Sequence, residues 1–263
     1  MNTTPFFHSL LAHNLASDAA RQTSIHMNIR KLIVTATLAL ATTIAAHAGP
    51  ITKGGFIISK PGKYFLTKNI NALIPLNYNS PVGIVIQTSD VELDLAGFTI
   101  GPTNNLGIGI YLVNGVSRVR IHNGRVQGVQ TAVLSEVNGA ISSCLFERLQ
   151  IAECTNDSFR IKGQESVVRS CIVTKIAVQH HGMIILTSLG SFSEVSDCTL
   201  SSTLGASTGI NAGLTDGLVV RRCVVEGFEE GIRVTPGCKL FDNLTLHCTN
   251  PIVGNPVLVG SNN

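Results

Sequence analysis

The 263-residue chain carries 19 Lys and Arg against 16 Asp and Glu, so its formal net charge is only +3. This near balance gives no electrostatic basis for binding nucleic acid or an anionic membrane surface. The chain has no Trp and 25 Gly, a composition suited to a narrow core filled with small and aliphatic side chains.

Residues 1–48 have the features of an export signal. Met27 begins a short basic segment, residues 32–45 are apolar and uncharged, and Ala48 and Gly49 form a small-residue cleavage site. The apolar stretch is too short for a comfortable membrane span. We expect Met27 to be the true start, with residues 1–26 as an extended leader being the alternative, and cleavage after Ala48.

The mature chain is therefore expected to be exported, whether to the periplasm, the cell surface or the medium, and to have no transmembrane segment. Its residues 49–82 precede the regular part of the sequence. Pro61 and Gly62 mark a turn, and the following Tyr64 to Thr67 predict a short strand. We expect this segment to form an N-terminal cap and a first strand.

Residues 83–250 contain a repeat of about 24 residues. Its marker is the pattern apolar-x-x-Cys-x-apolar, in which a small, amide or apolar residue can replace the Cys. The first residues of its seven copies are Leu95, Ile121, Phe146, Val168, Val195, Val220 and Leu240. A second marker, Gly followed by alternating apolar residues, falls 9 to 14 residues before the next anchor. Each repeat therefore holds two short strand patterns.

The period-two alternation excludes helical repeats, which need apolar residues at i, i+3, i+4 and i+7. We predict an all-β fold, a right-handed parallel β-helix of about seven coils and roughly 30 to 35 Å in length at about 4.8 Å per coil. Residues 251–263 contain two prolines and are expected to form a C-terminal tail.

Cysteines occupy one position in three successive repeats, at Cys171, Cys198 and Cys223. They are expected to form an internal ladder of free thiols, because stacked parallel side chains seldom have disulfide geometry. Pairing of Cys144 with Cys154, or of Cys238 with Cys248, stays open. No spacing among the seven cysteines resembles a zinc site.

Residues 57–128 resemble the start of exported bacterial right-handed parallel β-helix repeat proteins of the pectin-lyase-like superfamily. The shared features are PGKYFLT, VELDLAGFTI and IHNGRVQG. The resemblance implies the fold and, through the superfamily, polysaccharide as the ligand class; it implies activity poorly.

Residues 155–190 are similar to a polygalacturonase segment that reads roughly DDC-AIK-G, then GHG. By this resemblance Asp157 and His181 are the candidate catalytic residues, and Lys162, His180 and Arg233 are candidate substrate-binding residues. The first aspartate of the family's pair is Asn156 here, and inverting glycoside hydrolysis needs two carboxyl groups.

Two other site chemistries have weaker support. Asp90, Glu92 and Asp94 alternate along one strand and are expected to be a solvated face, so Ca²⁺ enters only under a pectate-lyase alternative. Copper binding would use His122, His180, His181, His247 and Met183, but adjacent strand residues point to opposite faces. We expect no resident metal and no cofactor.

The sequence thus favours a non-catalytic binding or surface role with polysaccharide as the ligand. A carbohydrate-active enzyme acting on acidic polysaccharide, of the pectate-lyase or polygalacturonase type, is the alternative. The two differ in whether two carboxylates, or a carboxylate and a base, converge on adjacent coils.

Overall fold

The computed structural model describes residues 47–75, 78–101, 106–135, 140–174, 181–187, 193–212 and 217–262. The chain divides into two units, Met1–Ala45 and Ala46–Asn263, and all described residues belong to the second. Within them every regular element is a strand, and no helix is long and apolar enough to cross a membrane. The predicted signal region, apart from its last two residues, lies outside the described part.

The strands coil into a parallel β-helix with three ladders. Ladder one is formed by β1 (His47–Ile51), β3 (Gly62–Leu66), β6 (Val91–Asp94), β9 (Val119–Gln127), β12 (Leu145–Ala152), β14 (Val167–Arg169), β17 (Ser193–Ser196), β19 (Leu218–Arg221), β21 (Lys239–Phe241) and β24 (Val257–Val259).

Ladder two is formed by β4 (Ile70–Asn71), β7 (Thr99–Gly101), the second halves of β9 and β12, β15 (Ile172–Thr174), the first parts of β18 (Thr199–Ala212) and β20 (Val224–Val234), and β22 (Leu244–Leu246).

Ladder three is formed by β2 (Phe56–Ile58), β5 (Val82–Ile86), β8 (Ile108–Leu112), β10 (Thr131–Ser135), β13 (Phe159–Gln164), β16 (His181–Thr187), the last parts of β18 and β20, and β23 (Asn250–Val253). The short β11 (Ile141–Ser142) pairs with the end of β13.

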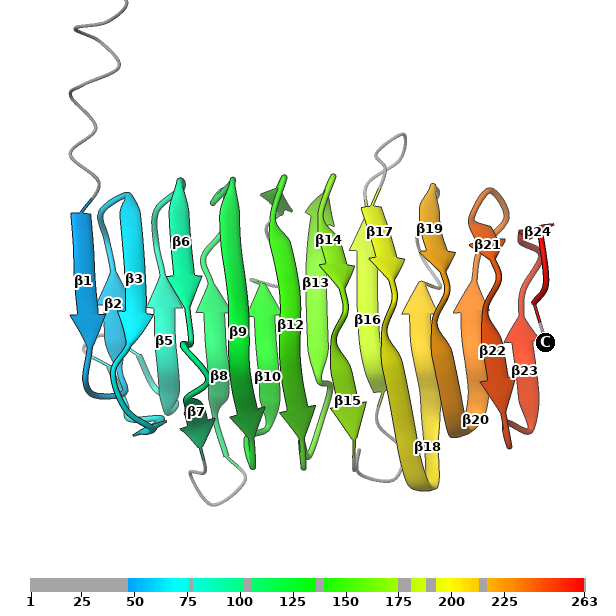
Figure 1. Ribbon diagram of the computed structural model, residues 1–263, viewed down its shortest axis with the longest axis horizontal. Helices are drawn as coiled ribbons and strands as arrows, with labels where there is room; N and C mark the ends of the chain where they lie inside the picture. The colour runs from blue at the N-terminus through cyan, green and yellow to red at the C-terminus, as the bar shows by residue number, and fades with distance from the viewer. Residues whose placement is uncertain are drawn as a thin grey trace, which may run out of the picture. The chain divides into compact units, whose positions relative to one another are not determined.

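The coil is right-handed. In Figure 1 the strands of ladder one point down at the front and those of ladder three point up behind them, while the chain advances from left to right. The predicted fold class is confirmed. The ladders continue beyond the seven anchored coils at both ends. Strands β1 to β4 pair within the stack in the segment predicted as an N-terminal cap and first strand, and β23 and β24 pair within it at and beyond the start of the predicted tail.

One anchor is shifted from its predicted place. Leu93, and not Leu95, pairs with Ile121, while Ile100 pairs with Val126 as the repeat predicts. The difference arises because this corner holds two more residues than the next one. Ala96 and Gly97 have positive φ angles of 50° and 78° and accommodate the longer turn.

The other apolar-x-x-Cys anchors make one recurring corner between ladders one and two. The residue before the Cys position has a left-handed backbone in each of six successive coils, at Asn123, Arg148, Ser170, Asp197, Arg222 and Asp242. The next side chain then points into the coil and reaches the preceding coil. Cys198 Sγ lies 3.8 Å from the Val168 carbonyl oxygen, and Cys223 Sγ lies 3.7 Å from that of Val195.

Cys171, Cys198 and Cys223 are 0%, 1% and 1% exposed and stand in successive coils. Asn243 ends the series, since its Nδ2 donates to the Val220 carbonyl at 3.0 Å and its Oδ1 accepts from the Cys223 amide at 3.0 Å. From Cys171 to Asn243 the corner position therefore holds a small side chain that donates to the previous coil, whereas Gly124 and Leu149 take this position in the two coils before.

All seven cysteines are free thiols. The two disulfides left open by the sequence do not form, because the partners lie at different corners: Cys144 precedes β12 and Cys154 follows it, while Cys238 precedes β21 and Cys248 follows β22. Burial raises the pKa of Cys144 to about 11 and that of Cys154 to about 12, so both stay protonated at neutral pH.

The glycine marker also has a steric cause. A Cβ at Gly83 would lie 2.4 Å from the Gly109 carbonyl oxygen of the next coil, and one at Gly209 would lie 2.3 Å from Val225 Cγ1. At Gly83 and Gly209 the coils are thus too close together for a side chain. The column is not glycine throughout, because Ala132 and Ser158 take the same position in coils between them.

Replacing Cys198 with Asp tests the interior corner. A carboxyl group there would be buried without a cationic partner, so we expect Cys198→Asp to lower the free energy of unfolding by several kcal/mol, on the order of 3 or more. Cys198→Ala is the control, with an expected cost of about 1 to 2 kcal/mol from the small cavity. Chemical denaturation gives both values, and a Cys198→Asp midpoint equal to that of the native chain would refute the interior placement.

Candidate functional site

Ladder three carries two columns of side chains that include the residues singled out from the sequence. We call them the starting column and the middle column. The starting column is Val82, Ile108, Thr131, Asp157, His181, Thr208, Glu230 and Asn250. The middle column is Val85, Tyr111, Leu134, Arg160, Ile184, Asn211, Arg233 and Val253. Together they form the ladder-three face.

Asp157 and His181 stand in adjacent coils, because Phe159 pairs with Met183 and each lies two residues earlier. Asp157 is 1% exposed, and its Oδ2 lies 3.4 Å from Arg160 Nε. The catalytic role of these two residues stays a prediction. His180 lies outside the described residues.

Lys162 lies on the same face, two residues beyond Arg160 on β13, and pairs with Leu186 of the next coil. Arg233 stands in the middle column three coils beyond Arg160, where it forms an ion pair with Glu230. Glu230 Oε2 also accepts a hydrogen bond of 3.0 Å from Thr208 Oγ1. All the described candidates thus share one face, but Arg233 is remote from Asp157.

The carboxylates of this face do not form a catalytic pair. Asp157 and Glu230 stand three coils apart, which is about 14 Å at 4.8 Å per coil. Inverting glycosidases hold their two carboxyl groups about 6.5 to 9.5 Å apart, and retaining ones about 5 Å. Each carboxylate also has an arginine beside it.

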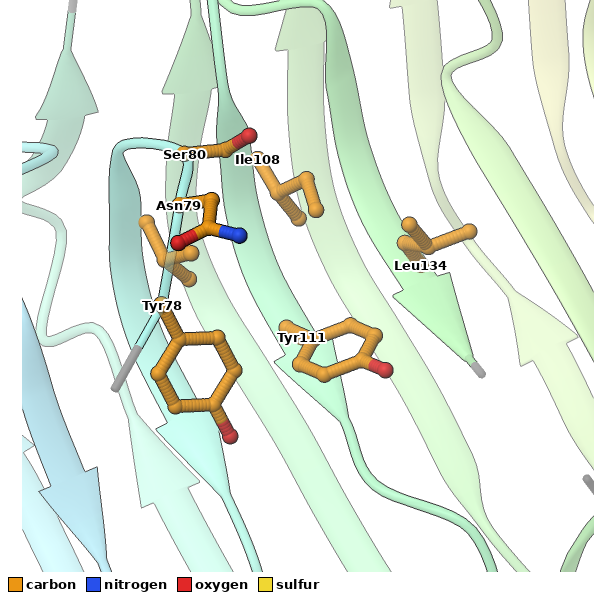
Figure 2. A pocket seen from close by; sticks show the side chains of 7 residues that line it. Tyr78, Asn79, Ser80, Ile108, Tyr111 and Leu134 are labelled. Atoms are coloured by element: carbon orange, nitrogen blue, oxygen red, sulfur yellow. The ribbon is translucent and has the colours of Figure 1, made fainter. Parts of the chain in front are cut away.

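At its N-terminal end the face holds an aromatic pocket (Figure 2). It has a volume of about 260 Å³ and is lined by Tyr78, Asn79, Ser80, Val82, Ile108, Tyr111 and Leu134. The Tyr78 and Tyr111 rings meet edge to face, with centroids 6.0 Å apart. Tyr78 comes from the segment that precedes β5, whereas Tyr111 belongs to β8, so the pocket spans neighbouring coils.

The outer face of ladder one carries a network of ion pairs that the sequence analysis missed. Glu147, only 2% exposed, accepts hydrogen bonds from Arg120 Nε at 2.8 Å and from Arg169 Nε at 2.9 Å. Glu92 accepts from Arg120 and lies 3.0 Å from Lys63 Nζ. Each bond joins one coil to a neighbouring coil.

A signal for this network was present in the repeat. The residues that follow the strand anchors in successive coils are Asp94, His122, Glu147 and Arg169, and the register stacks them in one column. Opposite charges in adjacent coils predict cross-strand pairs. The apolar anchors alone do not reveal this column, because its charged residues lie between the anchor positions.

Glu147 is held ionised. Burial alone would raise the pKa of this carboxyl, but the hydrogen bonds from Arg120 and Arg169 outweigh burial and lower that pKa to about 2. A carboxyl with so low a pKa does not act as a general acid near neutral pH, and its occupied oxygens do not act as a base. The ladder-one cluster is therefore a structural clamp.

The calcium and copper sites considered from the sequence gain no support from the described residues. Glu92 is paired with Lys63 and Arg120, and Asp90 forms a separate ion pair with Arg118 at 2.6 Å. Met183 is 0% exposed and lies inside the coil. Over the described ranges, no group of three His, Cys, Asp or Glu side chains is arranged to hold a metal ion.

The structure is similar to the crystal structure of pectate lyase Pel9A, with a TM-score of 0.51 and 10% identity over 83% of this chain and 67% of that chain. It also matches PfbA, a surface adhesin of Streptococcus pneumoniae, with a TM-score of 0.31 and 10% identity over 85% and 89% of the two chains, which is too low to carry an argument. No family model and no curated protein matches the sequence. At this identity the first match shows the parallel β-helix fold and not the activity.

The Glu147 clamp predicts a specific response to acid. Because its pKa in the folded chain lies below the ordinary value of 4.5, the carboxylate stabilises the fold fully above about pH 4.5, and this contribution is lost as the pH falls towards 2. Glu147→Gln is expected to cost about 1 to 2 kcal/mol at pH 7, since both arginines are partly exposed. The difference from the native chain should shrink towards zero near pH 2.

Denaturant titrations of both chains at pH 7, 5, 4, 3 and 2 measure this difference. Asp90→Asn, which breaks an exposed ion pair with Arg118, is the matched control and should cost less than 1 kcal/mol at any pH. A Glu147→Gln penalty that stays constant from pH 7 to pH 2 would contradict the clamp.

Proposed function

We propose that this protein is an exported β-helix protein that binds a linear polysaccharide along the ladder-three face without cleaving it. The observation that carries the proposal is the make-up of that face. An aromatic pocket at one end continues into a row of hydrogen-bonding and charged side chains over the following coils.

The geometry of the stack suits an extended glycan. Successive coils repeat about every 4.8 Å along the long axis, close to the length of one pyranose residue in an extended chain. A polysaccharide lying parallel to that axis would therefore meet one coil per sugar. Hydroxyl groups need donors and acceptors at that spacing, and Asn211 and Arg160, both partly exposed, are of the required type.

The charge of the face favours an acidic glycan for its C-terminal half. Arg160, Lys162 and Arg233 provide three positive charges. Asp157 and Glu230 provide two negative charges. Lys and Arg on this face would attract uronate carboxylates, and such contacts raise the association rate and the specificity more than the affinity. Binding should accordingly weaken as the salt concentration rises.

Binding without cleavage is supported by the carboxyl groups of the described part of the face. Asp157 and Glu230 are too far apart for glycoside hydrolysis, and Glu147 is clamped on another ladder. Binding without cleavage needs no such pair. Export is supported by the signal-like sequence that ends at Ala48, and the strand β1 begins at His47, so the predicted cleavage falls at the very start of the stack.

A second candidate is an enzyme of the polygalacturonase type, and one observation favours it. Asp157 and His181 stand in adjacent coils with Lys162 on the same face, as the resemblance requires. In that case Asp157 would act on the glycosidic bond with a partner that is not a second carboxylate. A lyase reaction would in addition require Ca²⁺ from solution.

A combined retention and turnover screen separates the two. The protein is tested against polygalacturonate, pectin and neutral polysaccharides, with and without Ca²⁺, for retention, new reducing ends and unsaturated products. We expect retention without products. Products that appear with the native chain and vanish in Asp157→Asn would overturn the non-catalytic proposal in favour of the enzyme.

The charged part of the face has its own test. Lys162→Ala should weaken binding of polygalacturonate by about three- to tenfold at low salt, because one contact to a carboxylate is lost. Lys239→Ala is the matched control: it removes an exposed lysine from ladder one and should leave affinity unchanged. Equal affinities for the native chain and Lys162→Ala, measured by calorimetry, would remove Lys162 from the site.

A further inference from the structure

We propose that the pocket between Tyr78 and Tyr111 is a subsite for one neutral pyranose ring and that it sets where a bound glycan begins on the ladder-three face. This inference deepens the proposed function and depends on it. The inference assigns a neutral sugar to the pocket, whereas the charged half of the face does not specify the sugar bound there.

The lining selects for an uncharged ligand. Two tyrosine rings and the side chains of Val82, Ile108 and Leu134 make most of the wall, and Asn79 and Ser80 stand at its rim. Among the described residues that line the pocket, the tyrosine hydroxyls are the only ionisable groups. A uronate carboxylate placed here would lose hydration without meeting a cation, which disfavours an acidic sugar.

The size of the pocket limits what it can hold. A volume of about 260 Å³ lies just below the usual range for drug-sized ligands, which begins near 300 Å³. This size suits one sugar ring, and a longer glycan would then leave the pocket and continue along the face.

The arrangement of the rings suits a pyranose. Edge-to-face rings at 6.0 Å present one flat apolar surface and one ring edge to the space beside them (Figure 2). The C–H faces of a pyranose pack on an aromatic surface, while its equatorial hydroxyl groups point sideways to polar partners. Asn79 and Ser80, both exposed, provide such partners next to the rings.

Tyr78 is held in place before any ligand arrives. Its amide donates to the Pro75 carbonyl at 3.2 Å, and its hydroxyl accepts from Gln87 Nε2 at 3.1 Å, beyond the far end of β5. The segment that carries it is tied to the stack by two hydrogen bonds between Leu73 and Val82, of 3.1 and 2.8 Å. A ring ordered in advance loses little entropy on binding, which favours affinity.

Tyrosine fluorescence gives a direct measurement, because the chain has no Trp and only three Tyr, two of which line the pocket. The third, Tyr64, is 6% exposed in β3. Titration with neutral cello-, manno- and xylo-oligosaccharides should change the emission saturably for at least one series. Oligogalacturonides of equal length should change the emission less than the neutral series does. An oligogalacturonide with a neutral sugar at one end should change it as much as the neutral series.

Tyr111→Ala should weaken binding of that neutral series by about tenfold or more, which corresponds to about 1.4 kcal/mol. Tyr78→Phe keeps the ring and should bind nearly as well as the native chain. Phe65→Ala is the matched control, since it removes a 40% exposed aromatic ring from the outer face of ladder one. Circular dichroism shows whether each variant is folded.

The outcomes separate this inference from the proposed function. Acidic glycans bound equally by the native chain and Tyr111→Ala, with no neutral series bound, would overturn the subsite and leave the binding face. Saturable binding of indole or phenol with no response to any sugar would also overturn it, since the pocket would then serve an apolar ligand. If no glycan binds at all, the proposed function fails together with the subsite.

Discussion

The fold depends on one constraint, which is that each coil must lie directly on the next at the spacing of parallel strands. Every interior position then becomes a column whose members touch the same position one coil away. The corner between ladders one and two shows the result, because its residues must be small or aliphatic and must follow a left-handed residue. Cys171, Cys198 and Cys223 meet both conditions, and Asn243 replaces the thiol with an amide that reaches the same carbonyl.

The same constraint divides the outer surface into regions with different roles. On ladder one the stacking brings Glu147 between Arg120 and Arg169, so the charges there are used to join coils. On ladder three the middle column runs from aromatic and aliphatic residues to arginine and asparagine, and its exposed groups stand at the spacing of a polymer repeat. The first arrangement stabilises the stack, whereas the second offers a surface for an extended ligand.

The sequence predicted the fold well, because a solenoid repeats its pattern and every copy can be compared with the others. Val168, Val195 and Val220 were placed in register, as the strand pairing confirms. Leu95 was misplaced by two residues, since its corner is longer and the repeat pattern tolerates the shift. The extra strands β1 and β24 were missed because the end coils carry no Cys anchor.

The site was harder to predict for a physical reason. Asp157 and His181 were proposed from a family resemblance, and the register places them in adjacent coils. The pocket of Tyr78 and Tyr111 was not found, because Tyr78 reaches the face from an irregular segment and no spacing in the repeat links it to β8. Contacts that depend on a loop folding back over a strand leave no periodic trace in the sequence.

Methyl-labelled NMR spectroscopy of the protein with a bound oligosaccharide tests the central claim most directly. The ladder-three face carries Ile108, Leu134 and Ile184, whereas the outer face of ladder one carries Leu145, Val167 and Val219. We predict ligand-dependent shifts in the first set and unchanged signals in the second. Shifts confined to the ladder-one methyl groups would contradict the account.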